Sequence, residues 1–212
     1  MIFNYFKTAL RNILRNKTVS FINIAGLSIG LTVCMLILLF IKDELSFDRF
    51  HAKKEQIFRV TTRMTNERLT RLIANTNQIV GPSFAEEIPE VQTFIRMQSN
   101  SFIVRHDADV TELEATFVDN NFFSVFSFPL ISGDPGKVLS DLHSIVLSEK
   151  TAIKYFGTTD VLGKTLELKI DSIFEPFIIT GVAKNPPQNS TIQFNILLPF
   201  KFNLKLYTDN AW

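Results

Sequence analysis

The chain has 212 residues, a formal net charge of +1 and a single cysteine, Cys34. The nearly balanced charge gives no support for a nucleic-acid partner, which needs a basic surface, and one cysteine excludes an intrachain disulfide bond. The length is enough for a membrane anchor followed by one or two compact lobes.

The first segment is basic and amphipathic. It contains no Asp or Glu and carries four cations, Lys7, Arg11, Arg15 and Lys17. Apolar side chains recur at helical spacing on one stripe of residues 2–15, and the basic ones recur on another. We therefore expect a cytoplasmic helix over residues 1–19 that lies on the membrane surface, with the four cations toward anionic headgroups. This helix either only sets the topology or also couples the chain to a cytoplasmic partner.

The next segment, residues 21–41, contains no charged side chain. At ~1.5 Å per residue a helix of this length is about 31 Å long, which matches a hydrocarbon core of ~30 Å. A cleaved signal peptide has a shorter apolar run of ~7–15 residues and a small-residue cleavage site, which is missing here. We expect an uncleaved transmembrane helix over residues 20–42. The basic flank predicts a cytoplasmic N-terminus and a periplasmic or otherwise extracytoplasmic main domain.

The small and polar residues of the span share one helix face. They are Asn23, Gly26, Gly30 and Cys34, spaced three, four and four residues apart. Gly26 and Gly30 form a G-x-x-x-G pair, which lets a second helix approach closely. Glycine is also common in membrane helices without such a role. We favour a helix-packing face at these four positions.

Residues 43–212 predict a mixed α+β extracytoplasmic domain. In chain order, we expect a strand at 57–65, a helix at 82–88, strands at 91–97, 101–105 and 114–118, a short aromatic helix at 120–126, a strand at 144–147, a helix at 148–156, and strands at 165–170, 177–182 and 192–198. The helices and strands interleave without regular βαβ spacing, so the fold class is α+β and not a doubly wound sheet.

No catalytic or metal-binding pattern is present. The three histidines, His51, His106 and His143, share no ligand spacing. Residues 106–109 are better read as a polar hairpin tip than as a metal site, and the aromatic cluster Phe122, Phe123, Phe126 and Phe128 as core. There is no P-loop and no nucleophile motif. We therefore expect no enzyme activity and no catalytic, cofactor-binding or metal-binding residues.

Several blocks resemble one family when taken together. After the basic segment and the span come LSFDRFHAKKEQIFRV, FAEEIPEVQTFIRM, FVDNNFFSVFSFPLISGDPGKVLSDLHSIVLSEKTAIKYFG, VLGKTLEL and FIITGVAKNPPQNSTIQFNILLPF. In this order they resemble the N-terminal portion of bacterial ABC transporter permeases of the MacB/FtsX type, which carry a MacB-like periplasmic core domain in the inner (plasma) membrane.

The resemblance implies a permease subunit that transmits ATPase-driven motion through the membrane to an extracytoplasmic domain, for export, extraction or regulation. The partners it implies are an ABC ATPase subunit, a second permease subunit in a homo- or heterodimer, membrane lipid and a periplasmic partner. Family members have four spans, with the large domain inserted between the first and the second.

The sequence departs from this pattern because it ends before a second span. Either the chain is an N-terminal fragment, or the remaining spans belong to a continuation of the sequence. The domain over residues 43–212 is either complete or lacks a part, and in the second case we expect an unpaired strand edge near residues 192–200. The alternative is a single-span, membrane-anchored extracytoplasmic sensor or binding module. That alternative explains the topology but not the family-like blocks. A membrane-anchored hydrolase lacks any nucleophile–base pattern.

Overall fold

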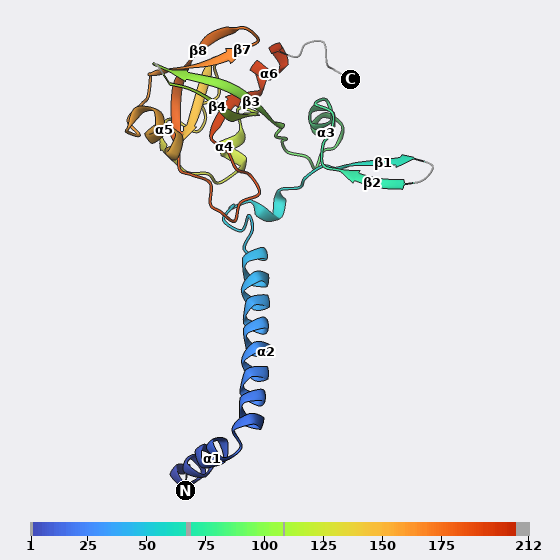
Figure 1. Cartoon of the computed structure of the whole chain (residues 1–212). Coiled ribbons are helices and arrows are strands. Elements are labelled where there is room, and N and C mark those ends of the chain that lie inside the picture. Colours follow the sequence, from blue (N-terminus) through green and yellow to red (C-terminus); the bar gives the residue numbers. More distant parts are fainter. Residues whose placement is uncertain (1, 67–68, 108, 207–212) are drawn as a thin grey trace. The chain divides into compact units, whose positions relative to one another are not determined.

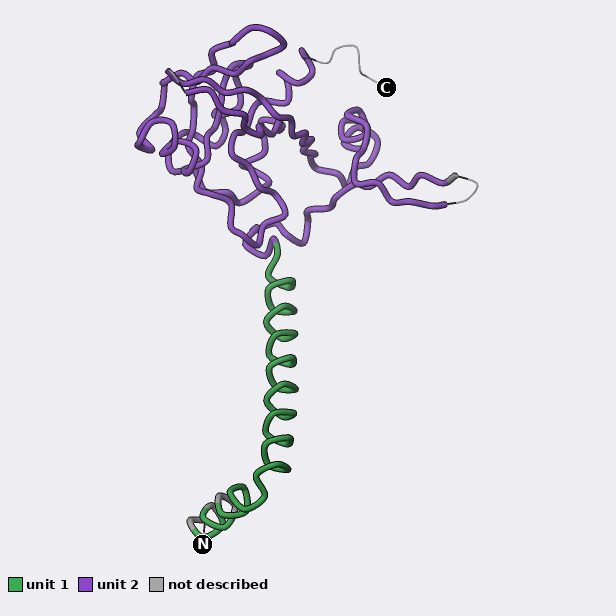
Figure 2. Tube along the Cα trace, in the orientation of Figure 1, with its two compact units in different colours: residues 1–47 green, residues 48–212 purple. Residues whose placement is uncertain are grey.

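The computed structural model describes residues 2–66, 69–107 and 109–206. The chain divides into two compact units, residues 1–47 and 48–212 (Figure 2).

The first unit consists of two helices, α1 (Ile2–Arg15) and α2 (Lys17–Glu44). They are separated at Asn16, whose backbone leaves the helical region at φ −111° and ψ 60°. The Asn16 side chain donates to Asn12 Oδ1 at 3.1 Å. A short polar side chain that bonds locally competes with continued helix, which accounts for the break here. Lys17 therefore lies in α2 and not in the basic helix where we expected it.

The second unit is mixed α+β, as the sequence predicts. Its elements are the 3₁₀ helix η1 (Lys54–Gln56), β1 (Thr62–Asn66), β2 (Leu69–Ile73), α3 (Val80–Glu87), β3 (Met97–His106), β4 (Asp109–Val118), α4 (Phe122–Val125), β5 (Leu130–Ser132), β6 (Ser144–Ser148), α5 (Glu149–Phe156), β7 (Thr165–Ile170), β8 (Ile173–Ala183), β9 (Ile196–Pro199) and α6 (Phe200–Leu206). β1 and β2 form a separate two-stranded arm (Figure 1).

Several predicted boundaries were wrong. Residues 57–61 are not part of a strand, and the first strand begins only at Thr62. Residues 91–96 were expected to be a strand but are irregular, because the side chains of Asp119 and Asn121, between β4 and α4, satisfy part of their backbone. β2, β5 and α6 were not among the predicted elements.

The large sheet of the described region closes on itself. Its seven strands run in the order β5-β8-β6-β9-β4-β3-β7, and β7 also pairs with β8. The long strand β8 makes the closure. Its first half pairs with β7, from Ile173 opposite Ile170 to Ile178 opposite Thr165, and its second half pairs in parallel with β6. A closed sheet of this kind leaves few open edges.

β9 lies inside this sheet and not at an edge, so the expected unpaired edge near residues 192–200 was wrong. β9 pairs in parallel with β4, where Ile196 is opposite Ala115, and antiparallel with β6, where Leu197 is opposite Val146. All its residues are buried. The continuous apolar run of β9 reflects burial on both faces, which is typical of a central strand.

The core has two parts because β6 and β9 bury both faces. Ile145, Leu147 and Phe117 belong to the larger cluster, which also includes Phe177 and Phe202. The intervening Val146 and Leu197 face a second cluster. That second cluster contains buried Phe122 and Phe128, with the partly buried Phe123 and Phe126 packed against it. The prediction that these four aromatic residues form core is confirmed.

Candidate functional site

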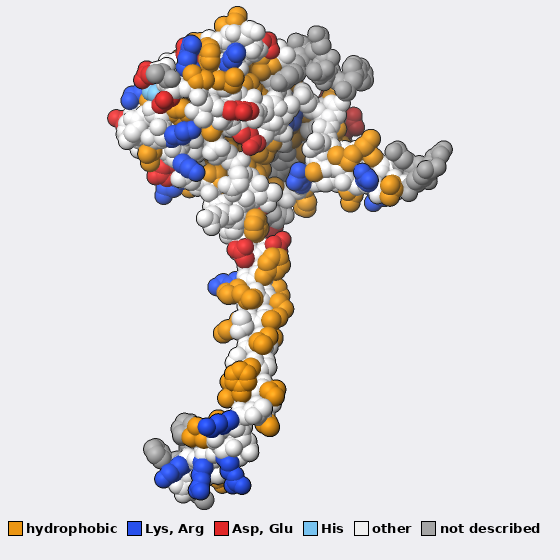
Figure 3. Space-filling view, viewed as in Figure 1, with side chains coloured by type: hydrophobic (Ala, Val, Ile, Leu, Met, Phe, Trp, Pro, Cys, Tyr) orange, Lys and Arg blue, Asp and Glu red, His pale blue; other side chains and the backbone are white. Residues whose placement is uncertain are grey.

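α2 is the one helix of the described residues with the length and composition to cross a membrane. At ~1.5 Å per residue, its 28 residues extend about 42 Å, and none is buried within the protein. Apolar side chains cover its surface, whereas Lys and Arg gather on the segment before it (Figure 3). Lys7, Arg11, Arg15 and Lys17 are all exposed.

The face of α2 that carries Asn23, Gly26, Gly30 and Cys34 is open. A Cβ atom added to Gly26 or Gly30 would meet no atom within 4 Å apart from neighbouring parts of the helix itself. Cys34 is exposed and free. The surface of these glycines is therefore accessible to a second helix in the described structure.

The residues that directly follow this unit are fastened to the sheet domain. We call this set the junction cluster: Asp48, His51, Ala52 and Lys53 on one side, with Ser124, Ser127, Asn189, Ser190 and Thr191 on the other. The contacts join positions 71–143 residues apart in the sequence. No spacing motif marks such a cluster, so sequence reasoning missed it.

Asp48 makes the first set of contacts. Its Oδ1 accepts from the Thr191 backbone N–H at 2.9 Å and from the Ser190 hydroxyl at 3.3 Å, while its own N–H donates to the Asn189 carbonyl at 3.0 Å. Asp48 also has a φ of 55°, a left-handed conformation that Asp tolerates better than most residues. The chain therefore turns sharply here and is bonded to the loop that leads into β9.

These bonds set the ionisation of Asp48. Partial burial acts to raise its pKa, but the bonds from Thr191 and Ser190, aided by nearby His51, outweigh burial and lower the pKa below the ordinary 3.8. An Asp whose folded-state pKa is lowered stabilises the protein above its unfolded pKa. The contribution of Asp48 is thus complete above pH 3.8 and is lost as the pH falls through its lower folded value.

His51, Ala52 and Lys53 make the second set of contacts, to α4 and to the loop that follows it. The Ser127 N–H donates to His51 Nδ1 at 3.0 Å, and the Ser127 hydroxyl accepts from the Ala52 N–H at 2.9 Å. The Lys53 ammonium donates to the Ser124 carbonyl at 3.0 Å. The junction cluster therefore ties one short segment to two separate loops of the sheet domain.

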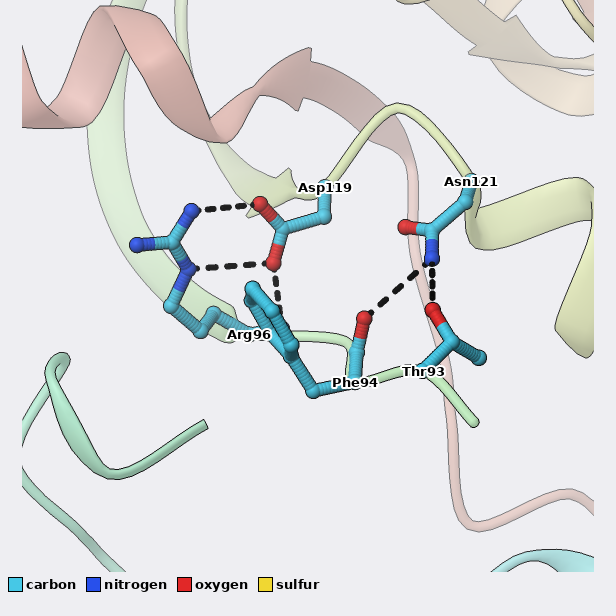
Figure 4. A network of polar contacts seen from close by, with 5 residues as sticks. All are labelled: Thr93, Phe94, Arg96, Asp119 and Asn121. Atoms are coloured by element: carbon cyan, nitrogen blue, oxygen red, sulfur yellow. Dashed lines mark hydrogen bonds and ion pairs between the residues drawn. The ribbon is translucent and has the colours of Figure 1, made fainter. Parts of the chain in front are cut away.

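A second network fixes the segment that precedes β3 (Figure 4). The Asp119 carboxylate accepts from the backbone N–H of Arg96 at 2.7 Å and from its guanidinium at 3.0 and 2.6 Å. The guanidinium lies 4.3 Å from the centre of the Phe200 ring. Asn121 donates to the Thr93 hydroxyl at 2.7 Å and to the Phe94 carbonyl at 3.3 Å. This network anchors the far end of the segment that contains β1, β2 and α3.

The histidines do not come together. His51 lies in the junction cluster, His106 at the β3–β4 hairpin and His143 beside Glu175. Among the described residues there is no group of three or more His, Cys, Asp or Glu side chains placed to hold a metal ion. Residues 106 and 109 face each other at the hairpin end, which confirms the predicted hairpin tip; Ala108 lies outside the described residues.

A family model for the MacB-like periplasmic core domain matches residues 20–211. The chain belongs to this family. Domains of this kind are the periplasmic parts of inner-membrane permeases that work with ABC ATPase partners. The resemblance drawn from the sequence blocks is thus confirmed at the level of the family. No curated protein matches the chain.

Similar solved structures belong to the same class. The crystal structure of a domain of a permease protein from Porphyromonas gingivalis matches with 28% identity and a TM-score of 0.54, covering 67% of this chain and 60% of that one. The extracellular domain of the noncanonic ABC-type transporter YknZ from Gram-positive bacteria matches with 18% identity and a TM-score of 0.50, covering 64% and 68%. The periplasmic region of MacB from Actinobacillus actinomycetemcomitans has 20% identity and a TM-score of 0.49, covering 64% and 60%. The chain thus spans 60% of the length of the Porphyromonas domain.

Proposed function

We propose that the chain is a permease subunit, or the N-terminal portion of one, in which α2 crosses the inner membrane and residues 48–212 lie in the periplasm. α1 lies on the cytoplasmic surface, with Lys7, Arg11 and Arg15 toward anionic headgroups. The four basic residues before the apolar run support this orientation, because basic flanks stay in the cytoplasm. The subunit transmits the motion of an ABC ATPase partner to the periplasmic domain, where it serves export, extraction or regulation.

The family match over residues 20–211 supports the permease assignment, and the junction cluster is the observation that supports the route by which motion is transmitted. α2 ends at Glu44, and Asp48 follows within a few residues. Asp48 is bonded to residues 190 and 191, which lead into β9 at the centre of the sheet. A displacement of the backbone at the end of α2 therefore reaches the central strand through charged hydrogen bonds, which contribute ~1.5–3 kcal/mol each.

Removing the Asp48 carboxylate tests this route. In Asp48→Ala, we expect local opening of the 187–195 loop to rise about tenfold or more, since at least one charge-assisted bond is lost. The measurement is hydrogen–deuterium exchange of the full chain, purified from membranes with its ATPase, with and without ATP. Wild type should change its exchange at residues 187–195 when ATP is added, and Asp48→Ala should hydrolyse ATP without that change.

Glu55→Ala is the matched control, because Glu55 is an exposed carboxylate in the adjacent turn. It should leave the ATP response intact. An unchanged ATP response in Asp48→Ala would show that motion does not pass through the junction cluster. ATP hydrolysis that is indifferent to the presence of the chain would contradict the permease assignment itself.

We further propose that the face of Asn23, Gly26, Gly30 and Cys34 packs against another helix of the transporter, such as one from a second permease subunit. Gly30→Arg should then abolish assembly, because a charge near mid-bilayer costs ~2.5–3.5 kcal/mol on insertion scales. The readouts are the membrane-integrated fraction and the yield of complex. Thr18→Arg, near the start of α2, should have little effect because a long cation there reaches the interface. Wild-type insertion and yield for Gly30→Arg would contradict the proposal.

A further inference from the structure

The His51 ring is enclosed by aromatic side chains. His51 is 4% exposed, and its ring centre lies 4.0 Å from that of Phe50, 5.3 Å from Phe126 and 5.2 Å from Phe128. Its Nε2 atom is buried and has no hydrogen-bond partner among the described residues. The Nε2 side of the ring therefore receives no hydrogen bond that could compensate the desolvation of a charged imidazolium among these aromatic rings.

The contact at Nδ1 fixes the protonation state of the ring. A backbone N–H can only donate, so the 3.0 Å bond from Ser127 N requires a lone pair on Nδ1. His51 is therefore neutral, with its proton on Nε2. When a second proton binds Nδ1, both atoms of this contact become donors. The bond is then replaced by a repulsion between two N–H groups, and the loop that carries Ser127 loses its contact to the ring.

The charged groups near His51 act in opposite directions: the Asp48 carboxylate favours protonation of the ring, and the Lys53 ammonium disfavours it. Asp48 is the one ionised group with a resolved effect on the ring, and its carboxylate is already engaged by Ser190 and Thr191. Residues 120–133 and 185–200, which supply the two loops, contain no Asp, Glu, Lys, Arg or His. Lys53, on the segment of His51 itself, donates to Ser124 O and adds a positive charge to the same loop contact.

From this geometry we propose that His51 is a pH-sensitive latch, whose protonation releases residues 124–128, at the end of α4 and the start of the following loop, from the segment that follows α2. Burial lowers the pKa of His51 below the ordinary 6.5, and Asp48 partly offsets this effect. A histidine whose folded pKa is lowered binds its proton more readily in the open state. The latched state is therefore fully stable above pH 6.5 and is weakened as the pH falls below 6.5.

Only the consequence of the latch rests on the proposed function. That consequence is that acidification of the outer compartment would loosen the junction cluster and reduce the coupling between the ATPase partner and the periplasmic domain. The latch itself is a property of the domain. It can therefore be tested without ATP or an ATPase, so that its failure would leave the Asp48 experiment unaffected.

The test is hydrogen–deuterium exchange of the full chain in detergent at pH 7.5 and pH 5.5, corrected for intrinsic exchange rates. The equilibrium constant for local opening at residues 124–128 should be about tenfold larger at pH 5.5 than at pH 7.5. The lower pH is one unit below the ordinary histidine pKa of 6.5, and protonation of the open state then favours opening by about that factor. His51→Asn keeps an acceptor near the position of Nδ1 but cannot titrate in this range. This variant should exchange equally at both pH values, whereas the control His106→Asn should respond as wild type does.

A second measurement needs no variant. Exchange of the imidazole C2 proton, followed by mass spectrometry, reports the pKa of each histidine in the wild-type chain. His51 should titrate below pH 6.5 and exchange slowly. Exchange at residues 124–128 that does not change between pH 7.5 and 5.5, or a His51 that titrates at or above 6.5, would overturn the latch.

Discussion

Truncating Phe117 to alanine is expected to lower the free energy of unfolding of the sheet domain by about 3–5 kcal/mol. Phe117 lies on β4 and is 0% exposed. Its ring contacts Phe102 edge-on at 5.7 Å between centres and Phe202 in a stacked arrangement at 6.5 Å. The cavity left behind would lie inside a closed sheet, where the surrounding strands cannot collapse far to fill it.

The measurement is the urea midpoint of the full chain in detergent, read by pulse proteolysis. Phe58→Ala is the matched control, because the same truncation at a side chain that is 84% exposed should change stability by no more than about 0.5 kcal/mol. Similar midpoints for the two variants would mean that Phe117 does not lie in the core of a closed sheet.

Asp119→Ala is the second change with a large expected effect, about 3–5 kcal/mol. The carboxylate accepts three hydrogen bonds from Arg96, and the two side chains are only 14% and 20% exposed. Without Asp119, the guanidinium would remain partly buried between the rings of Phe94 and Phe200 with no counter-charge. The cost comes from that unpaired charge and from the orphaned Arg96 N–H.

Glu167→Ala provides the comparison, because Glu167 also pairs with an arginine, Arg105, but at the surface. It should destabilise the domain much less than Asp119→Ala, since an exposed pair contributes little. The urea midpoints of unfolding of the two variants, read by pulse proteolysis, test this difference. Proteolysis between residues 73 and 96 should also accelerate in Asp119→Ala, because Asp119 holds the end of that segment. Equal losses in the two variants would contradict this role for the network.

The parts of the fold that the sequence predicted are those with local causes. α5 was found because Ser148 caps its start, accepting from Thr151 N, and Gly157 ends it at a φ of 70°. β6 was found from a short apolar run between turn residues, and β7 from its alternating apolar positions. Only the second part of β8 was found, because the expected strand began at residue 177 and β8 begins at Ile173. The aromatic core under α4 was found from helix-like spacing of phenylalanines. Each of these signals acts over a few residues and can be read without knowing the tertiary structure.

The parts that failed depend on long-range pairing. The position of β9 at the centre of the sheet follows from pairing with β4 and β6, about 80 and 50 residues away in the chain, which local patterns do not encode. Residues 91–96 look like a strand by composition, but side chains of Asp119 and Asn121 take the place of a neighbouring strand. The short pairing of β5 with the end of β8 gave no signal of its own.

The junction cluster was within the blocks that suggested the family, yet its role was not predicted. Asp48 and His51 both lie in LSFDRFHAKK, and their partners Ser190 and Ser127 lie in two other blocks. The available local signal was an Asp shortly after the long apolar run; its left-handed conformation is known only from the structure. What the sequence could not show is which of the many serines and threonines lie opposite it.

The proposed transmission of motion requires that α2 crosses the membrane and that residues 48–212 lie outside. The decisive measurement is labelling of single cysteines, in a Cys34→Ser background, with a membrane-impermeant maleimide on spheroplasts. Lys164→Cys, in the sheet domain, should be labelled in intact spheroplasts, and Lys7→Cys, on α1, should be labelled only after the membrane is opened. Labelling of position 7 but not position 164 in intact spheroplasts would contradict the orientation, and with it the proposed transmission of motion through the junction cluster.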